Sequence, residues 1–289
     1  MVADNGTGPD YGQVTLGGGM HLHYERHVGA PHHRCVVLLH SLGMDHTFWR
    51  LVAPLLYGKA SVICVDVRGH GQSSKPPGPY SISLFAQDIK QLIDALGYKQ
   101  VIVAGASMGG CIAMQFATAF PDSTVALGLF DTTSWYGETA ASDWAARAEK
   151  ARQNGFKSMV DFQVTRWFSD SFRTTHPAVL QDCVDTFVRN DLDAYMATCH
   201  AMGSFDARDA TAGLRIPTAI IVGSEDYAAP PKMSDRLHQA IPGSELTIIP
   251  GARHLTPLED PDTIAAALLH LIEATGADMA DDARASQDH

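Results

Sequence analysis

The stretch VIVAGASMGG, residues 101–110, runs from an apolar segment into a glycine-rich turn with a serine at its apex. Six small or apolar residues precede Ser107, which favours a strand buried on both faces of a parallel sheet. Gly105 and Gly109 stand two residues to either side of Ser107, where only small residues let a strand and the following helix pass closely. The stretch therefore predicts a strand, a strained turn and a helix, with the Ser107 hydroxyl exposed at the carboxyl edge of a sheet.

Other short apolar runs repeat this pattern and alternate with helical patterns. They span residues 35–40, 61–67, 125–130, 218–222 and 246–249. The helical stretch 81–96 carries its apolar residues on one stripe, as a helix that covers a sheet should. We predict an α/β fold with a doubly wound, mostly parallel sheet, preceded by an antiparallel hairpin over 13–16 and 21–26.

One interval lacks a convincing buried strand. Between Asp131 and Ile216 the chain carries helical patterns and three of its four tryptophans. We interpret residues 134–212 as a helical cap inserted into a core formed by residues 1–133 and 213–289. The polar residues after Gly276 are expected to form a disordered tail.

The composition, with 45% hydrophobic and 18% charged residues, is that of a soluble globular protein. A formal net charge of -11 argues against nucleic acid or an anionic membrane surface as the partner. No apolar run approaches the roughly 20 residues that span a bilayer, and the N-terminus lacks the pattern of a secretory signal. The five cysteines lack CxxC spacing and are typical of buried reduced thiols, so we expect a cytoplasmic protein and leave a homodimer open.

The 14 histidines raise the question of a metal site. His21 and His23 alternate along an expected strand, and His32 and His33 lie in an expected loop. No cluster of carboxylates or cysteines stands beside them in the sequence, whereas zinc sites need three or four converging ligands. We therefore expect neither a metal nor a cofactor.

Ser107 has candidate partners at two later positions on the same sheet edge. Asp226 follows the strand TAIIV, and His254 lies in the loop after the strand LTII. A serine hydroxyl needs a base such as His254 to take its proton, and the imidazole needs a carboxylate to fix its tautomer. We expect Ser107, Asp226 and His254 to form a catalytic triad. Asp131 also ends a strand at this edge and is the alternative acid.

Two main-chain N–H groups are candidates for an oxyanion hole. One belongs to Met108, directly after Ser107, and the other to Leu42 in the loop 40–45. Preorganised donors of this kind are each worth about 2.7–4 kcal/mol of transition-state stabilisation.

Several motifs together resemble the α/β-hydrolase superfamily over nearly the whole chain: DVRGHGQS at 66–73, the GASMG turn and GARHLTPLEDP at 251–261. HSLGMDHTFW at 40–49 and VGSEDYAAPP at 222–231, with the RWF at 166–168, are similar to 3-oxoadipate enol-lactonases and related lactonases and esterases. The resemblance implies an α/β-hydrolase fold with a cap. It also implies a serine hydrolase that cleaves a small carboxylic ester or lactone through an acyl-enzyme on Ser107.

Aromatic residues of the expected cap, Trp135, Trp167 and Phe168, are candidates to line the substrate pocket, because ligand sites are mostly apolar. The resemblance leads us to expect a basic residue after the strand 125–130, but Trp135 stands there. We therefore expect a less charged, aromatic ester or lactone as the substrate.

Other functions stay open on the same residues. A cofactor-free haloperoxidase or perhydrolase shares the triad, and a carbon–carbon hydrolase of aromatic meta-cleavage products is similar in layout. Haloalkane dehalogenases and epoxide hydrolases use an aspartate where Ser107 stands. A non-catalytic ligand receptor on the same fold is the alternative from another class, and turnover of a p-nitrophenyl ester would separate it from an enzyme.

Overall fold

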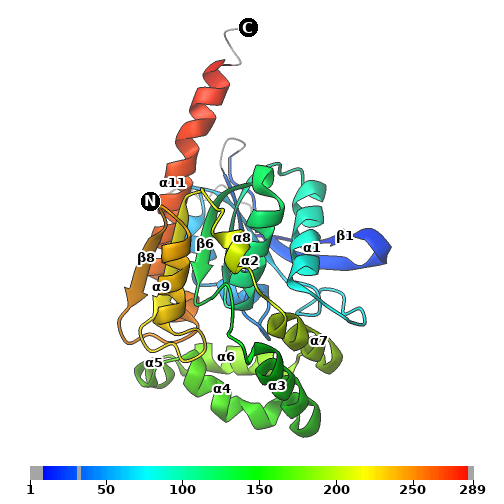
Figure 1. The fold of residues 1–289 in the computed structure, drawn as a ribbon. Coiled ribbons are helices and arrows are strands. Elements are labelled where there is room, and N and C mark those ends of the chain that lie inside the picture. Colours follow the sequence, from blue (N-terminus) through cyan, green and yellow to red (C-terminus); the bar gives the residue numbers. More distant parts are fainter. Residues whose placement is uncertain (1–8, 31–33, 286–289) are drawn as a thin grey trace.

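The computed structural model describes residues 9–30 and 34–285, with side chains up to residue 276. These residues form one eight-stranded sheet with the strand order β1-β2-β4-β3-β5-β6-β7-β8 (Figure 1). The strands are β1 Asp10–Thr15, β2 His21–His27, β3 Cys35–Leu39, β4 Ser61–Val65, β5 Val101–Ala106, β6 Thr124–Phe130, β7 Thr218–Gly223 and β8 Glu245–Ile249. The predicted hairpin is present, because β1 pairs antiparallel with β2.

The sheet from β4 to β8 is parallel throughout, and only β2 joins it in the antiparallel sense. Every residue of β3, β4, β5 and β7 is buried. This explains why these strands have continuous apolar sequences rather than alternating ones. The predicted α/β class with a mostly parallel, doubly wound sheet is confirmed.

Helices cover the sheet. Those outside the β6–β7 interval are α1 Ile82–Ala95, α2 Met108–Ala119, α9 Pro231–Ala240, α10 Thr256–Glu259 and α11 Pro261–Ala285. The Ser81 side chain accepts a hydrogen bond from the N–H of Leu84 and so caps α1, which packs beside α2. At the other end of the sheet, α11 packs against β6 and β7. The short 3-10 helices are η1 Gly17–Gly19, η2 His46–Trp49, η3 Ala53–Leu56, η4 Pro121–Ser123 and η5 Phe156–Met159.

The chain between β6 and β7 is helical, as expected. It contains α3 Ala140–Asn154, α4 Val160–Trp167, α5 Asp170–Thr175, α6 Pro177–Val188, α7 Leu192–Gly203 and α8 Arg208–Thr211. Figure 1 shows α3 to α7 gathered at one end of the sheet. Their shared core is aromatic, since the rings of Phe156, Phe187 and Tyr195 pack edge to face, with centroids 5.0–6.0 Å apart. Of these helices, α3 and α4 line a cavity that also contains Ser107.

The C-terminal helix is longer than the sequence analysis predicted. The expectation of a disordered tail after Gly276 is wrong as far as Ala285, because α11 continues to that residue and projects from the body (Figure 1). Alanine, methionine and arginine in this stretch favour a helix despite its polarity. Residues 286–289 lie outside the described part of the chain.

Two expectations from composition can be compared with the structure. All five cysteines are free and buried, including those outside the apolar segments for which burial was expected. Among the described helices, none is long and apolar enough to cross a membrane.

Candidate active site

Ser107 occupies the turn between β5 and α2 in a strained backbone conformation, with φ 54° and ψ -115°. Neighbouring segments hold it there. The N–H of Ser107 donates to the carbonyl of Phe130 at 2.8 Å, and its carbonyl accepts from the N–H of Cys111 and the hydroxyl of Thr132. A side chain at positive φ costs of order 1–3 kcal/mol and persists only where the surroundings impose it. The predicted strand, strained turn and helix are therefore present.

The glycines around Ser107 are required by close backbone contacts. A Cβ atom on Gly105 would lie 2.2 Å from the carbonyl of Gly109, and one on Gly109 would lie 2.0 Å from the carbonyl oxygen of Leu39. Real Cβ atoms do not approach backbone atoms so closely. The turn brings the amino end of α2 against the ends of β3 and β5, which directs the Ser107 hydroxyl out of the sheet edge.

The structure brings Ser107, His254 and Asp226 into one hydrogen-bonded chain. His254 Nε2 lies 3.0 Å from Ser107 Oγ, and His254 Nδ1 lies 2.7 Å from Asp226 Oδ2. Asp226 Oδ1 accepts hydrogen bonds from the N–H groups of Ala228 and Ala229, which fix the orientation of the carboxylate. Since Nδ1–H of His254 donates to the carboxylate, Nε2 is free to accept the Ser107 hydroxyl proton.

The loops that carry His254 and Asp226 meet beyond the ends of β7 and β8. A Cβ atom on Gly223, the last residue of β7, would lie 2.3 Å from the carbonyl oxygens of Ala252 and Arg253. The N–H of Glu225 donates to Ala252, so the two loops are also hydrogen-bonded. This contact sets the separation between the imidazole and its carboxylate.

Asp131, the alternative acid, supports the site from behind. It is fully buried at φ 48° and accepts hydrogen bonds from the N–H and hydroxyl of Thr256 at 2.9 and 2.7 Å. Burial, together with the nearby Asp226 carboxylate, raises the pKa of Asp131 well above its usual range. Among the described residues, the carboxylate oxygens of Asp131 accept hydrogen bonds from Thr256 and Gly223 and not from the imidazole of His254. Asp226 is therefore the carboxylate that the geometry assigns to His254.

Leu42, in the loop before η2, lines the same cavity as Ser107. His40 holds this loop, because its Nδ1–H donates to the carbonyl of Ser41 and its Nε2 accepts from the N–H of Val67. Met108 is the first residue of α2, where helical N–H groups have no intrahelical acceptor. Both predicted oxyanion-hole residues thus adjoin Ser107; their role in catalysis stays a prediction.

A cavity of about 360 Å³ opens above Ser107 and His254. Residues of the β6–β7 interval form most of its wall. The lining comprises Ser41, Leu42, Ser107, Tyr136, Ala140, Asp143, Trp144, Arg147, Phe162, Gln163, Arg166, Trp167, Ala228, Met233 and His254. This volume suits a small ligand.

Two arginines of this wall have no carboxylate partner. Arg147 Nε donates to the Tyr195 hydroxyl at 2.8 Å, and an Arg166 terminal nitrogen donates to the carbonyl of Tyr227 at 2.5 Å. Neither forms an ion pair within the described part of the chain. Burial lowers the pKa of Arg166, and the neighbouring positive charge of Arg147 lowers it further. The two guanidinium groups repel each other, so an anion between them would be stabilised.

Comparisons with known proteins identify the family of this chain. Residues 36–267 match the model of the alpha/beta hydrolase family. The chain belongs to this family. It is 30% identical to 3-oxoadipate enol-lactonase 2 of Acinetobacter baylyi, over 83% of this chain and 87% of that protein.

Solved structures of two hydrolases have a similar fold. The enol-lactonase of Burkholderia xenovorans is 30% identical and superposes with a TM-score of 0.85, over 91% of this chain and all of that one. An esterase of Thermogutta terrifontis is 26% identical, also with a TM-score of 0.85, over 92% of this chain and 99% of that one.

The predicted aromatic lining of this hydrolase is only partly present, since Trp167 lines the cavity and the other two residues lie elsewhere. Phe168 is fully buried and stacks on Phe172, because consecutive residues at the end of α4 face different sides. Trp135 forms a β-bridge with Asp206, and the Arg208 guanidinium lies 3.8 Å from its ring centroid. Sequence proximity to the strand end did not decide which ring faces the substrate.

The sequence analysis missed the cationic part of the pocket. Asp143 and Arg147 have the i,i+4 spacing of an intrahelical ion pair, which suggests a solvated helix face. In the structure Asp143 instead accepts from the Thr139 hydroxyl and Arg147 turns to Tyr195. Arg166 stood within the RWF motif, but nothing in the sequence showed that its side chain reaches the pocket.

Proposed function

We propose that this α/β hydrolase cleaves a small carboxylic ester or lactone through an acyl-enzyme formed on Ser107. The observation that carries the proposal is the hydrogen-bonded chain from Ser107 through His254 to Asp226, which opens onto the cavity. The similarity to 3-oxoadipate enol-lactonases and to an esterase supports the same bond class.

In this mechanism His254 Nε2 takes the hydroxyl proton while Ser107 Oγ attacks the carbonyl carbon. Asp226 holds the imidazole in the required tautomer and stabilises the imidazolium that forms. The N–H groups of Leu42 and Met108 would donate hydrogen bonds to the carbonyl oxygen as negative charge develops on it. His254 then protonates the leaving alkoxide, and a water molecule activated by the same nitrogen releases the acyl group.

Residues 134–212 would act as a cap that selects the substrate, above a core formed by 1–133 and 213–289. The cavity wall supports this division, because the residues from Tyr136 to Trp167 contribute most of the side chains that face Ser107.

Arg147 and Arg166, which form no ion pair among the described residues, support a substrate that carries a negative charge, such as a carboxylate some distance from the scissile bond. This reverses the expectation of a less charged substrate, which rested on the absence of a basic residue next to the strand 125–130. The cationic groups come instead from α3 and α4, through Arg147 and Arg166. A carboxylate-bearing lactone or ester fits both the charge and the names of the relatives.

A phosphonate probe tests the mechanism. A fluorophosphonate should label the wild-type chain once, at Ser107, and peptide mass spectrometry should locate the adduct. The Ser107→Ala variant should not be labelled and should not hydrolyse p-nitrophenyl acetate. Labelling at another residue, together with activity retained by the variant, would disprove the acyl-enzyme on Ser107.

A charge-matched pair of esters tests the substrate class. A p-nitrophenyl hemisuccinate and the corresponding neutral p-nitrophenyl ester have the same leaving group and differ in one carboxylate. Arg147→Gln or Arg166→Gln should raise KM for the anionic ester by roughly 10–100-fold, the worth of a charge-assisted hydrogen bond, and change KM for the neutral ester little. Arg152→Gln is the matched control, because Arg152 also lies on α3 but pairs with Glu149 outside the cavity. Equal effects on KM for both esters would contradict the proposal of an anionic substrate. The proposed triad mechanism would not be affected.

A further inference from the structure

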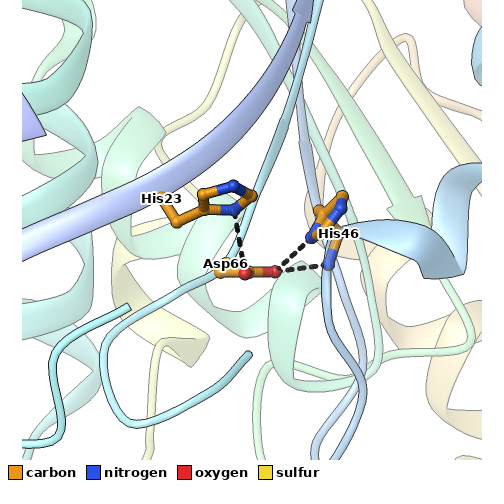
Figure 2. A group of neighbouring side chains, drawn as sticks. All are labelled: His23, His46 and Asp66. Carbon is orange, nitrogen blue, oxygen red and sulfur yellow. Dashed lines mark hydrogen bonds and ion pairs between the residues drawn. The ribbon is translucent and has the colours of Figure 1, made fainter. Parts of the chain in front are cut away.

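A second buried group of aspartate and histidine side chains lies outside the cavity. His23 on β2, His46 at the start of η2 and Asp66 directly after β4 converge (Figure 2). The sequence analysis found no cluster of carboxylates beside the strand histidines. That statement holds for sequence neighbours, but Asp66 lies 43 positions after His23 and reaches it through the antiparallel pairing of β2 with β4.

The two imidazoles direct the same ring atom at one carboxylate (Figure 2). His23 Nδ1 lies 3.1 Å from Asp66 Oδ2, and His46 Nδ1 lies 2.8 Å from Asp66 Oδ1. One potential ligand atom of each residue lies within 4.8 Å of those of the other two, and all three residues are buried. Two imidazoles and a carboxylate from three separate segments make up a donor set that divalent transition metals prefer.

We propose that His23 Nδ1, His46 Nδ1 and the Asp66 carboxylate bind one divalent transition-metal ion of the zinc class. Ligand atoms about 2.1 Å from a tetrahedral zinc ion lie roughly 3.4 Å apart, so the nitrogen–oxygen separations of 3.1 and 2.8 Å would have to lengthen by roughly 0.3–0.6 Å. An imidazole that binds the ion through Nδ1 carries its proton on Nε2, so both rings must adopt that tautomer. Two histidine–aspartate hydrogen bonds are then exchanged for metal–ligand bonds.

Two backbone N–H groups already orient the Asp66 carboxylate that would bind such an ion. The N–H of His46 donates to Oδ1 at 2.6 Å and the N–H of Gln72 donates to Oδ2 at 2.8 Å, so each oxygen keeps one lone pair for another partner. Backbone donors of this kind orient ligating carboxylates. Three protein ligands leave a fourth position for water.

Tyr11 of the edge strand β1 stands over the two rings. Its ring centroid lies 6.4 Å from that of His23 and 6.2 Å from that of His46, and its own side chain is exposed. The exposed Tyr11 ring therefore lies between the two imidazoles and solvent on this side. None of the three ligands lines the cavity above Ser107, so the ion would tie β2, η2 and the end of β4 together and take no part in hydrolysis.

The decisive variants are His23→Asn and His46→Asn. The asparagine amide nitrogen stands close to the position of Nδ1 and can still donate to Asp66, but it has no free lone pair for a metal ion. A purely structural hydrogen-bond cluster would therefore tolerate the change, whereas a metal site would be lost. The His32→Asn/His33→Asn double variant is the control for histidines elsewhere on the chain.

The experiment is a titration of Co²⁺ and Zn²⁺ into the untagged, EDTA-treated and dialysed chain, followed by calorimetry, visible absorption and thermal melting. We expect one ion per chain, a ligand-field band with Co²⁺ and a raised Tm with Zn²⁺ in the wild type and the control. Each of these should be lost in His23→Asn and in His46→Asn. Unchanged binding in both variants would overturn the proposal. So would a wild-type chain that binds no ion and shows no cobalt band, a result that stands even if the variants fail to fold.

Discussion

Two buried aspartate–histidine groups with similar local geometry differ in what the histidines face. Asp226 and Asp66 each accept hydrogen bonds from two backbone N–H groups at 2.6–2.9 Å. Asp226 also faces one histidine Nδ1 at 2.7 Å, whereas Asp66 faces two, at 2.8 and 3.1 Å. The far nitrogen of His254 meets the Ser107 hydroxyl at the floor of a cavity. In the other group, Nδ1 of His23 and Nδ1 of His46 both face the Asp66 carboxylate, and neither histidine lines the cavity.

In both groups a buried carboxylate joins segments that are distant in the sequence through histidine Nδ1 atoms. What gives it a chemistry is the third partner: a hydroxyl held at a strained turn in one case, a second imidazole in the other. Variants that change one residue at a time test this difference between the two groups.

The largest effect is expected at the hydroxyl. Ser107→Ala should lower kcat/KM for a p-nitrophenyl ester by at least about 10⁴-fold, because no other group at the turn can form the acyl-enzyme. Thermal melting should show a folded variant, since the hydrogen bonds of the turn use backbone atoms of residue 107. In the other group, His46→Asn should keep activity within about tenfold of the wild type, as substitutions away from the reacting groups do. A loss of equal size in both variants would contradict the division between the two groups.

The next effect separates the two strand-end aspartates. Asp226→Asn should lower kcat by roughly 10³–10⁴-fold, because an amide at this position favours the wrong imidazole tautomer. Asp131→Asn keeps an acceptor oxygen for Thr256 and should lower kcat by less than about tenfold. Steady-state kinetics of the two variants side by side provide the measurement. The opposite order would reassign the acid to Asp131.

A smaller effect concerns the pH dependence of stability. The pKa of Asp131 is raised in the folded chain above its value of about 3.9 in unfolded chains. The folded state therefore holds this proton more tightly, and the resulting stability is complete below about pH 4 and is lost as pH rises toward the folded-state pKa. Because asparagine does not titrate, the Tm of wild type minus that of Asp131→Asn should fall as pH rises above about 4. A difference that stays constant with pH would show that the carboxyl titrates normally.

The smallest expected effect on turnover is that of chelation. Ester hydrolysis should survive EDTA and dialysis with kcat unchanged within about twofold, because the proposed oxyanion donors are backbone N–H groups and no cavity residue belongs to the histidine–aspartate cluster of Figure 2. The Tm may be followed in the same samples, and a decrease there with unchanged kcat would place any bound ion outside the chemistry. Activity that is lost on chelation and restored by a divalent ion would contradict the metal-free mechanism.

The amino-acid sequence by itself determined the sheet, the turn at Ser107 and the candidate residues of the triad. These features depend on local rules: continuous apolar strands, glycines where backbones touch, and reactive residues directly after strands of a parallel sheet. Because parallel strands end at one edge, Ser107, Asp226 and His254 could be expected to meet without knowledge of any distance.

Only the tertiary structure decided which side chains turn toward one another. Asp131 and Asp226 both follow strands at the same edge, but Asp131 binds Thr256, and Asp226 meets the imidazole. Arg147 bonds Tyr195 and not Asp143, its neighbour on the helix, and it lines the cavity. Phe168 is buried, although the adjacent Trp167 lines the cavity. Asp66 meets His23 across paired strands. Such contacts depend on side-chain direction and on pairings between distant segments, and neither is encoded in the local pattern of the chain.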